Sequence, residues 1–135
     1  MTLFEIMAKK KNDQHYIHIE KKRLSRLKNK LKILRHVSKK NCALLPFLND
    51  ESLHTLGEFI FNVINQKISL DEKQIKKVRA VLKKDRNFYK KLIDVDTSNP
   101  LGYFRKSLQR KPQIGKGVVS LIATLAPFIA SLFLK

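Results

Sequence analysis

The carboxyl-terminal run is the feature that most constrains how this chain can fold. Residues 118–134, VVSLIATLAPFIASLFL, contain no charged side chain, whereas the whole chain carries 29 Lys and Arg residues against 11 Asp and Glu residues. As a helix, this run would reach roughly 25 Å, close to the ~30 Å thickness of the hydrocarbon core of a bilayer. Exposing so apolar a segment to water is unfavourable, so the first question is which surface covers it.

Three environments would satisfy the run, and the sequence leaves them open. The run could form a short or tilted membrane anchor, or a membrane-active or interfacial segment. It could also be buried against a partner, such as the inner face of a shell or further copies of the chain. Its apolar side chains lie nearly all round the helix, which argues against a plain interfacial helix with a polar face. The residues expected to contact a membrane or a partner are Val118, Leu121, Ile122, Leu125, Phe128, Ile129, Leu132 and Phe133.

The charge of the chain predicts a polyanionic partner. The formal net charge is +18, which exceeds what solubility requires and points to nucleic acid, an anionic membrane surface or an acidic protein. The basic residues are 22 lysines and 7 arginines. Because lysine is a hydrated point charge and arginine is the usual reader of guanine, this balance favours neutralisation of the phosphate backbone over sequence readout.

Residues 21–40 predict a basic amphipathic helix. Leucines recur there at spacings of three and four, at Leu24, Leu27, Leu31 and Leu34, so they share one helical face. This helix either packs its leucines on the next segment or forms a basic arm that folds on a polyanion. Its cationic side chains are Lys21, Lys22, Arg23, Arg26, Lys28, Lys30, Lys32 and Arg35.

Residues 41–95 predict a helical hairpin. Asn49 or Asp50 can cap its first helix, and the capping-box pattern from Ser69 to Glu72 opens the second. We expect the two helices to join on their apolar faces. The second helix has one apolar stripe, formed by Ile75, Val78, Leu82, Tyr89 and Leu92. Since no stretch alternates with a period of two, the expected fold is all-α: a small hairpin, a basic N-terminal helix and a separate apolar C-terminal helix.

Residues 96–117 predict a basic linker with no more than one turn of helix around Tyr103–Leu108, because Pro100, Gly102, Pro112, Gly115 and Gly117 interrupt helical patterns. The expected organisation is therefore an N-terminal segment, a basic helix, a hairpin domain, a linker and an apolar segment. Their boundaries are 1–20, 21–40, 41–95, 96–117 and 118–134.

The sequence indicates no catalytic centre, metal site or cofactor. His15 and His18 lie three residues apart, but no cysteine or third histidine lies nearby to complete a metal shell. Cys42 stands in an apolar setting and reads as a small hydrophobe, and a single cysteine forms no intramolecular disulfide. The glycines near residue 116 lack the spacing of a phosphate-binding loop. We therefore expect a protein that is not an enzyme.

Two stretches carry a resemblance to a known family. FNVINQKISLDEKQIKKVRAVLKKDRNFYKKLID, followed by SLQRKPQIGKGVVSLIATLAPFIASLFLK, resembles the small basic core proteins of polinton/Maverick elements and adintoviruses. Those proteins look related to the adenovirus core-peptide family, the precursors of peptide mu. The resemblance covers about residues 50–135. It implies a virion protein that binds and compacts double-stranded DNA in the virion core, within a host nucleus or cytoplasm.

The resemblance also implies candidate residues. Those expected to contact DNA are Lys73, Lys76, Lys77, Lys83, Lys84, Lys90, Lys91, Arg105, Lys106, Arg110 and Lys111. Proteases of the adenovirus type favour a large apolar residue followed by two spaced glycines, which makes Gly117, after Ile114, a candidate cleavage site. Lys116 departs from that pattern because it occupies the position of the first glycine.

We therefore expect a non-enzymatic core protein that condenses double-stranded DNA without sequence specificity. Its apolar tail would tether it to a capsid protein or a membrane, and self-association is a further expected contact. The alternative is a membrane-active or tail-anchored protein at a membrane, whose lysines contact anionic lipid.

Overall fold

The computed structural model describes residues 14–65 and 68–133, and the secondary structure of this part of the chain is helical, without strands. The all-α prediction is therefore confirmed. The α-helices are α2 (Gln14–His36), α3 (Asp50–Asn65), α4 (Glu72–Lys84), α5 (Arg86–Ile93), α6 (Pro100–Arg110), α7 (Pro112–Leu125) and α8 (Ile129–Phe133). Two 3₁₀ helices, η1 (Cys42–Phe47) and η2 (Ala126–Phe128), complete the set. Most of the predicted N-terminal segment, residues 1–13, lies outside the described residues.

Side-chain caps set where α3 and α4 begin. The Asn49 side chain accepts a hydrogen bond from the backbone N–H of Ser52 at 2.8 Å, so the predicted cap of α3 is confirmed. The capping box of α4 exists, but it lies two residues later than predicted. Asp71 Oδ1 accepts from the N–H of Gln74 at 2.7 Å, and Gln74 Oε1 accepts from the N–H of Asp71 at 3.1 Å. An Asp–Gln pair satisfies the same two donors as a Ser–Glu pair, so the sequence offered both registers.

The predicted basic linker over 96–117 is wrong, because two helices occupy most of it. Pro100 and Pro112 each lie in the first turn of a helix, where the missing N–H costs nothing and the fixed φ suits a helix. Asn99 precedes α6 with φ 48°, in the left-handed region that asparagine tolerates, and its side chain accepts from Gly102 N–H at 3.1 Å. The prolines therefore start helices here instead of breaking them.

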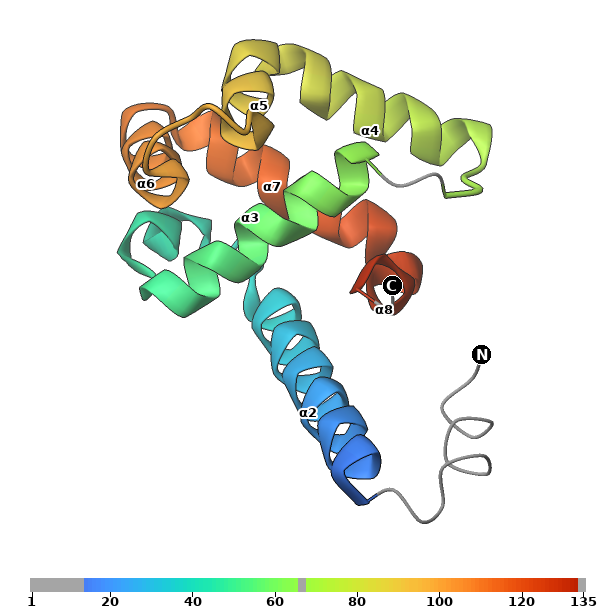
Figure 1. Cartoon of the computed structure of the whole chain (residues 1–135). Coiled ribbons are helices and arrows are strands. Elements are labelled where there is room, and N and C mark those ends of the chain that lie inside the picture. The colour runs from blue at the N-terminus through green and yellow to red at the C-terminus, as the bar shows by residue number, and fades with distance from the viewer. Residues whose placement is uncertain (1–13, 66–67, 134–135) are drawn as a thin grey trace.

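Helix α7 forms the centre of the molecule, and the prediction of a separate apolar C-terminal helix is wrong. It crosses behind α3 in Figure 1 and packs against α4, α6 and η1. Leu121 and Leu125 are fully buried, as is Val118. A helix this apolar is stable in water only when other elements cover its bulky side chains, and here the chain's own helices do so.

The outer face of the carboxyl-terminal stretch carries small side chains. Ala123, Ala126, Pro127, Ala130 and Ser131 are exposed, whereas the bulky aliphatic residues of α7 and α8 face the core. Asn62 of α3 also donates to the Leu132 carbonyl at 2.9 Å, which ties α8 to the body. The exposed and buried faces of this stretch therefore differ mainly in the size of their side chains and not in polarity.

The helices of the expected hairpin pack on different partners. Helix α4 packs mainly against α7, while α3 packs against α2, α6 and α8. The second predicted helix is also divided at Asp85, whose φ of −124° and ψ of 42° end α4. The break turns α5 so that Phe88 meets the rings of Tyr103 and Phe104 of α6, at centroid distances of 5.8 and 5.7 Å.

Helix α2 projects from the body, as Figure 1 shows. From Lys21 onward, where its side chains are described, burial increases toward the carboxyl end: Leu24 is 43% exposed, whereas Leu34 is fully covered. Lys30 Nζ donates to both carboxylate oxygens of Glu58 in α3, at 2.9 and 2.8 Å, and this ion pair lies where the helix leaves the body. The leucine stripe predicted from the sequence thus packs at one end only.

Candidate nucleic-acid interface

A cationic surface follows the outer sides of α4 and α5. In α4, Val78 is buried and the apolar residues around it face α7, so the remaining helical arc is left to solvent. Lysine and arginine occupy nearly all of that arc, and α5 continues it. We call this surface the ridge, and it consists of Lys73, Lys76, Lys77, Arg79, Lys83, Lys84, Arg86, Lys90 and Lys91, all exposed.

The ridge carries no exposed acidic side chain. The one carboxylate between Lys73 and Lys91 is Asp85, which is 7% exposed and accepts from Gln113 Nε2 of α7 at 2.8 Å. Burial, followed by the charge of Asp85, raises the pKa of the nearby Tyr89 hydroxyl, so that this group stays neutral. The surface potential of the ridge is therefore positive along its whole length.

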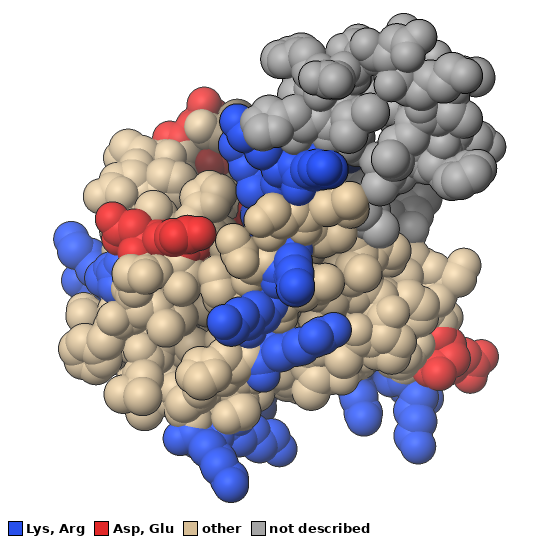
Figure 2. Space-filling model, turned by 90° about the horizontal axis from the view of Figure 1, so that it is seen from below, with Lys and Arg blue, Asp and Glu red and all other residues tan. Residues whose placement is uncertain are grey.

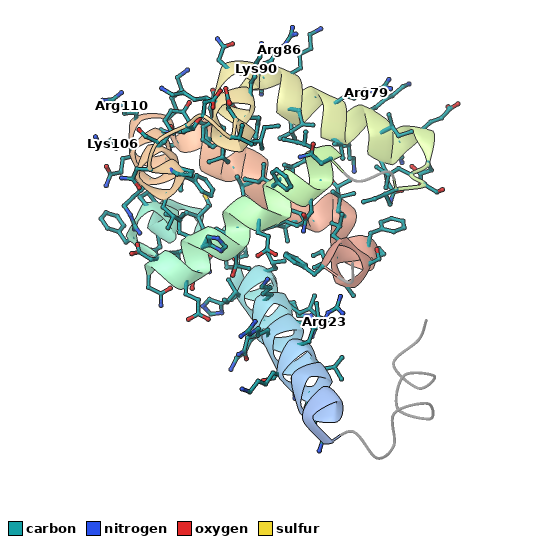
Figure 3. The ribbon with its side chains drawn as sticks, in the orientation of Figure 1. Arg23, Arg79, Arg86, Lys90, Lys106 and Arg110 are labelled. Carbon is teal, nitrogen blue, oxygen red and sulfur yellow. The ribbon has the colours of Figure 1, made fainter. Side chains whose placement is uncertain are left out.

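Three side chains of the ridge can be followed in Figure 3. Arg79, Arg86 and Lys90 lie along the top edge of the molecule in Figure 3, with their charged ends outward. Arg86 and Lys90 are four residues apart on α5, so they share a face. Lys91 bends toward α6, where its Nζ lies 4.7 Å from the centroid of the Tyr103 ring. The ridge thus ends next to α6.

Helix α6 adds cations beside a mixed cleft. Lys106 and Arg110 lie one turn apart, and with Lys91 they line a polar cleft of about 860 Å³. Asp94 and Asp96 line the same cleft, so the positive potential is partly offset there. Lys111 is exposed just after α6.

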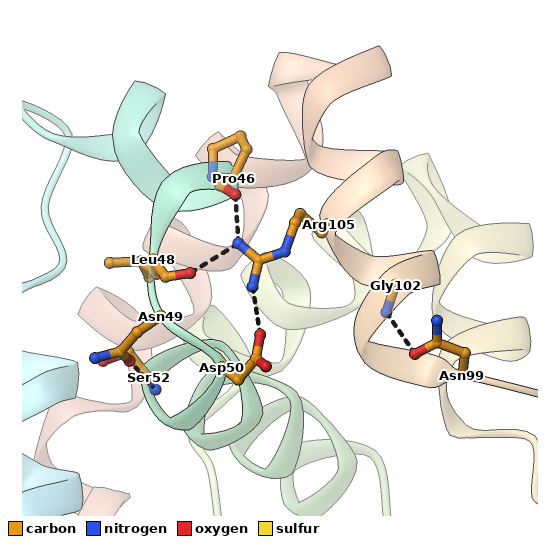
Figure 4. A network of polar contacts seen from close by, with 8 residues as sticks. All are labelled: Pro46, Leu48, Asn49, Asp50, Ser52, Asn99, Gly102 and Arg105. Carbon is orange, nitrogen blue, oxygen red and sulfur yellow. Dashed lines mark hydrogen bonds and ion pairs between the residues drawn. The ribbon is translucent and has the colours of Figure 1, made fainter.

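Arg105 is built into the fold, unlike the other residues expected to contact DNA. Its Nη1 donates to the carbonyl oxygens of Pro46 and Leu48, both at 2.7 Å, and its Nη2 pairs with Asp50 Oδ1 at 2.8 Å (Figure 4). These bonds join α6 to the junction of η1 and α3. With three donor–acceptor pairs already formed, the guanidinium has little left to offer a phosphate.

The cations of α2 form a second group. Lys30 has a structural role, because it pairs with Glu58 and its Nζ lies 5.2 Å above the Phe133 ring. Arg35 is exposed near the body, where it lines an apolar groove of about 780 Å³ together with Lys39 and Lys77. Lys32 is exposed just after Lys30, on the body side of this ion pair. The others are exposed on the projecting part, which we call the arm: Lys21, Lys22, Arg23, Arg26 and Lys28.

The residues expected to meet a membrane or partner lie mainly inside the molecule. Six of those eight side chains are buried, and Phe128 and Phe133 are partly buried. The stretch Pro112–Phe133 is nevertheless long and apolar enough to cross a membrane, with a mean hydropathy of 1.8, although a soluble core helix meets the same test.

Gly117 is placed where a protease would not reach it without unwinding α7. It lies inside that helix, and a Cβ there would approach Val81 Cγ1 to 3.2 Å and the Tyr89 hydroxyl to 3.3 Å. The close approach of α7 to α4 and α5 therefore accounts for the glycine. Cleavage at Gly117 would instead require an accessible and extended chain.

Two arginines of the ridge are absent from the set implied by the resemblance. Arg79 and Arg86 occupy the same exposed face as the lysines around them. The helical period alone identifies Arg79, since it lies three residues after Lys76 and four before Lys83.

Comparison with known proteins identifies no relative of this chain. No protein-family model, no curated protein and no solved structure matches this chain. Within residues 14–65 and 68–133, no three histidine, cysteine, aspartate or glutamate side chains gather as metal ligands would.

Proposed function

We propose that this protein is a non-enzymatic, DNA-binding and DNA-condensing protein that binds double-stranded DNA without sequence specificity through the ridge. The observation that carries the proposal is the run of exposed cations from Lys73 to Lys91 on α4 and α5, in which the only intervening carboxylate, Asp85, is buried. Helix α4, with 13 residues, extends roughly 20 Å, and α5 turns from its axis at Asp85. Duplex DNA presents about 12 negative charges over the length of α4, so the six cations of this helix suit it in density, and α5 adds three more.

Lysine chemistry supports binding without sequence readout. Seven of the nine ridge cations are lysines, which neutralise phosphate as point charges and do not form the bidentate contacts that identify guanine. If six of the nine contact phosphates, the logarithm of affinity falls with the logarithm of salt with a slope of roughly −5. The setting that we propose, the core of a virus or virus-like element, rests on the family resemblance alone.

The test compares two charge-matched variants of the full chain. K76Q/R79Q/K83Q removes three charges from one side of the ridge, and K39Q/K40Q/K116Q removes three exposed charges elsewhere. Binding to a duplex and to a scrambled duplex is measured by fluorescence anisotropy across a salt series. We expect equal affinity for the two duplexes. The ridge variant should bind on the order of 100-fold more weakly near physiological salt, with a slope shallower by about 2.7.

The control variant should keep the affinity and slope of the natural chain. Equal losses in the two variants would show that the ridge has no special role and that only net charge matters. A strong preference for one duplex would contradict the proposed neutralisation of the backbone.

A second candidate function, action on anionic membranes, is favoured by the length and hydropathy of Pro112–Phe133. It requires Leu121 and Leu125 to leave the core, so it predicts that vesicle binding is accompanied by loss of the folded body. Vesicles containing phosphatidylserine, added to the same series, test it. Binding to vesicles that exceeds binding to DNA at equal anionic charge would replace the first proposal with this one.

A further inference from the structure

The arm and the ridge are separated by a helix that carries no basic residue. Helix α3 lies between α4 and α2 in Figure 1. Its sequence, DESLHTLGEFIFNVIN, contains three acidic residues and neither lysine nor arginine. The positive potential is therefore interrupted on this side of the molecule.

The two surfaces also face different directions. Arg23 lies beside α2 in the lower half of Figure 3, on the opposite side of α3 from Arg79, Arg86 and Lys90 near the top edge. Seen from the α2 end, the basic side chains form several groups separated by uncharged surface (Figure 2). Lys21 lies nine residues before Lys30, so the arm extends about 14 Å beyond the ion pair that anchors it.

A single straight duplex does not reach both surfaces. DNA has a persistence length of about 150 base pairs, and bending a short site by 40–90° costs roughly 1–6 kcal/mol. The groove between the body end of α2 and α4 carries Arg35, Lys39 and Lys77, but its floor is apolar. It provides no continuous path of phosphate contacts that would repay such a bend.

We propose that one molecule binds two duplexes at once, one along the ridge and the other along the arm, and that the protein condenses DNA by bridging neighbouring duplexes. The inference rests on the proposed function, since it requires the ridge to bind DNA. The arm suits this role because exposed cations occupy the faces of the helix outside its leucine stripe. Repulsion among its lysines weakens the bare helix, and a duplex that neutralises them stabilises it.

The experiment is a sandwich assay with the full chain. One duplex is fixed to beads, a second and unrelated duplex is fluorescent, and the captured fluorescence is measured as protein is added. The arm variant K22Q/R23Q/R26Q is compared with the ridge variant K76Q/R79Q/K83Q, and K39Q/K40Q/K116Q is the control with the same net charge. Direct binding of each protein to a single duplex is measured in parallel, and circular dichroism checks that each variant folds.

We expect the arm variant to keep the natural affinity for a single duplex, whereas the ridge variant binds a single duplex on the order of 100-fold more weakly, as stated above. In both variants, capture of the second duplex should fall tenfold or more, because three contacts to one of the two duplexes are lost. The control should capture the second duplex as the natural chain does. Capture that survives in the arm variant would overturn the proposal, because two associated copies would then be bridging through their ridges.

Two other results have distinct meanings. If the control variant loses binding to a single duplex, the duplex runs through the groove beside Lys39 and the two-surface inference fails. If the natural chain binds no single duplex, the proposed function itself fails.

Discussion

Replacing Leu121 by alanine tests whether the apolar run is the core of this protein. Leu121 is fully buried in α7, among side chains from the surrounding helices. A buried leucine cut back to alanine costs about 2.7–5 kcal/mol, since both the transfer free energy and the cavity count against the folded state. For a two-state chain of 135 residues, a loss of 3 kcal/mol lowers the melting temperature by about 10 °C.

The measurement is thermal unfolding followed by circular dichroism, without lipid or DNA. Ala123→Ser is the matched control, because Ala123 lies on the exposed face of the same helix and its replacement changes the melting temperature by no more than about 2 °C. Ile122→Val, which removes one buried methylene, should fall between the two, with a cost of about 0.5–1.5 kcal/mol.

If Leu121→Ala and Ala123→Ser melt at the same temperature, α7 is not packed in the core and the reasoning is refuted. The run would then be available to a membrane or a partner, as one interpretation of the sequence had it. If the reasoning holds, DNA binding by Leu121→Ala depends on salt with the same slope as in the natural chain, at temperatures at which the variant is folded. The reason is that the substitution leaves the ridge unchanged.

Three other substitutions have defined outcomes. Tyr89→Phe should leave stability unchanged or raise it by up to about 1 kcal/mol in a denaturant titration, because the buried hydroxyl finds no hydrogen-bond partner among the described residues; a loss above 1 kcal/mol would reveal a partner. Arg105→Met should cost about 2 kcal/mol, since two carbonyl oxygens lose their donor, and should leave the salt slope of DNA binding unchanged; a shallower slope would return Arg105 to the DNA-contacting set. Asn99→Ala should cost about 1–2 kcal/mol by thermal unfolding, because it removes the cap of α6 at a left-handed residue, whereas Asn99→Gly should cost less; equal losses would show that the strain is small.

Local signals predicted the helical class and part of the candidate interface. The cap at Asn49 and the cationic arc of α4 depend on residues within a few positions of each other, so their chemistry can be read without knowing the fold. The start of α4 was misplaced because Ser69 and Asp71 both begin acceptable capping boxes. Proline was misread for a similar reason, since Pro100 and Pro112 interrupt a helix in its interior and favour it in its first turn.

Local sequence patterns could not predict which lysines and arginines are paired within the fold. Lys30 and Arg105 resemble their neighbours in sequence, yet each is paired with a group more than twenty residues away, in Glu58 and Asp50. Whether a cation is free for an anionic partner depends on which distant carboxylate or carbonyl the fold brings to it.

The sequence by itself determined the composition of the surface and the helical period of each segment, because charge and periodicity are properties of the chain. Only the tertiary structure decided what covers the apolar run. Hydrophobic burial has no direction, so residues 118–134 can be removed from water equally well by lipid, by a partner or by the chain's own helices. Here α4 and α6 pack around α7, because their apolar faces and the closely approaching glycines of α7 fit together. The segment that looked most like a tail is therefore the centre of the fold.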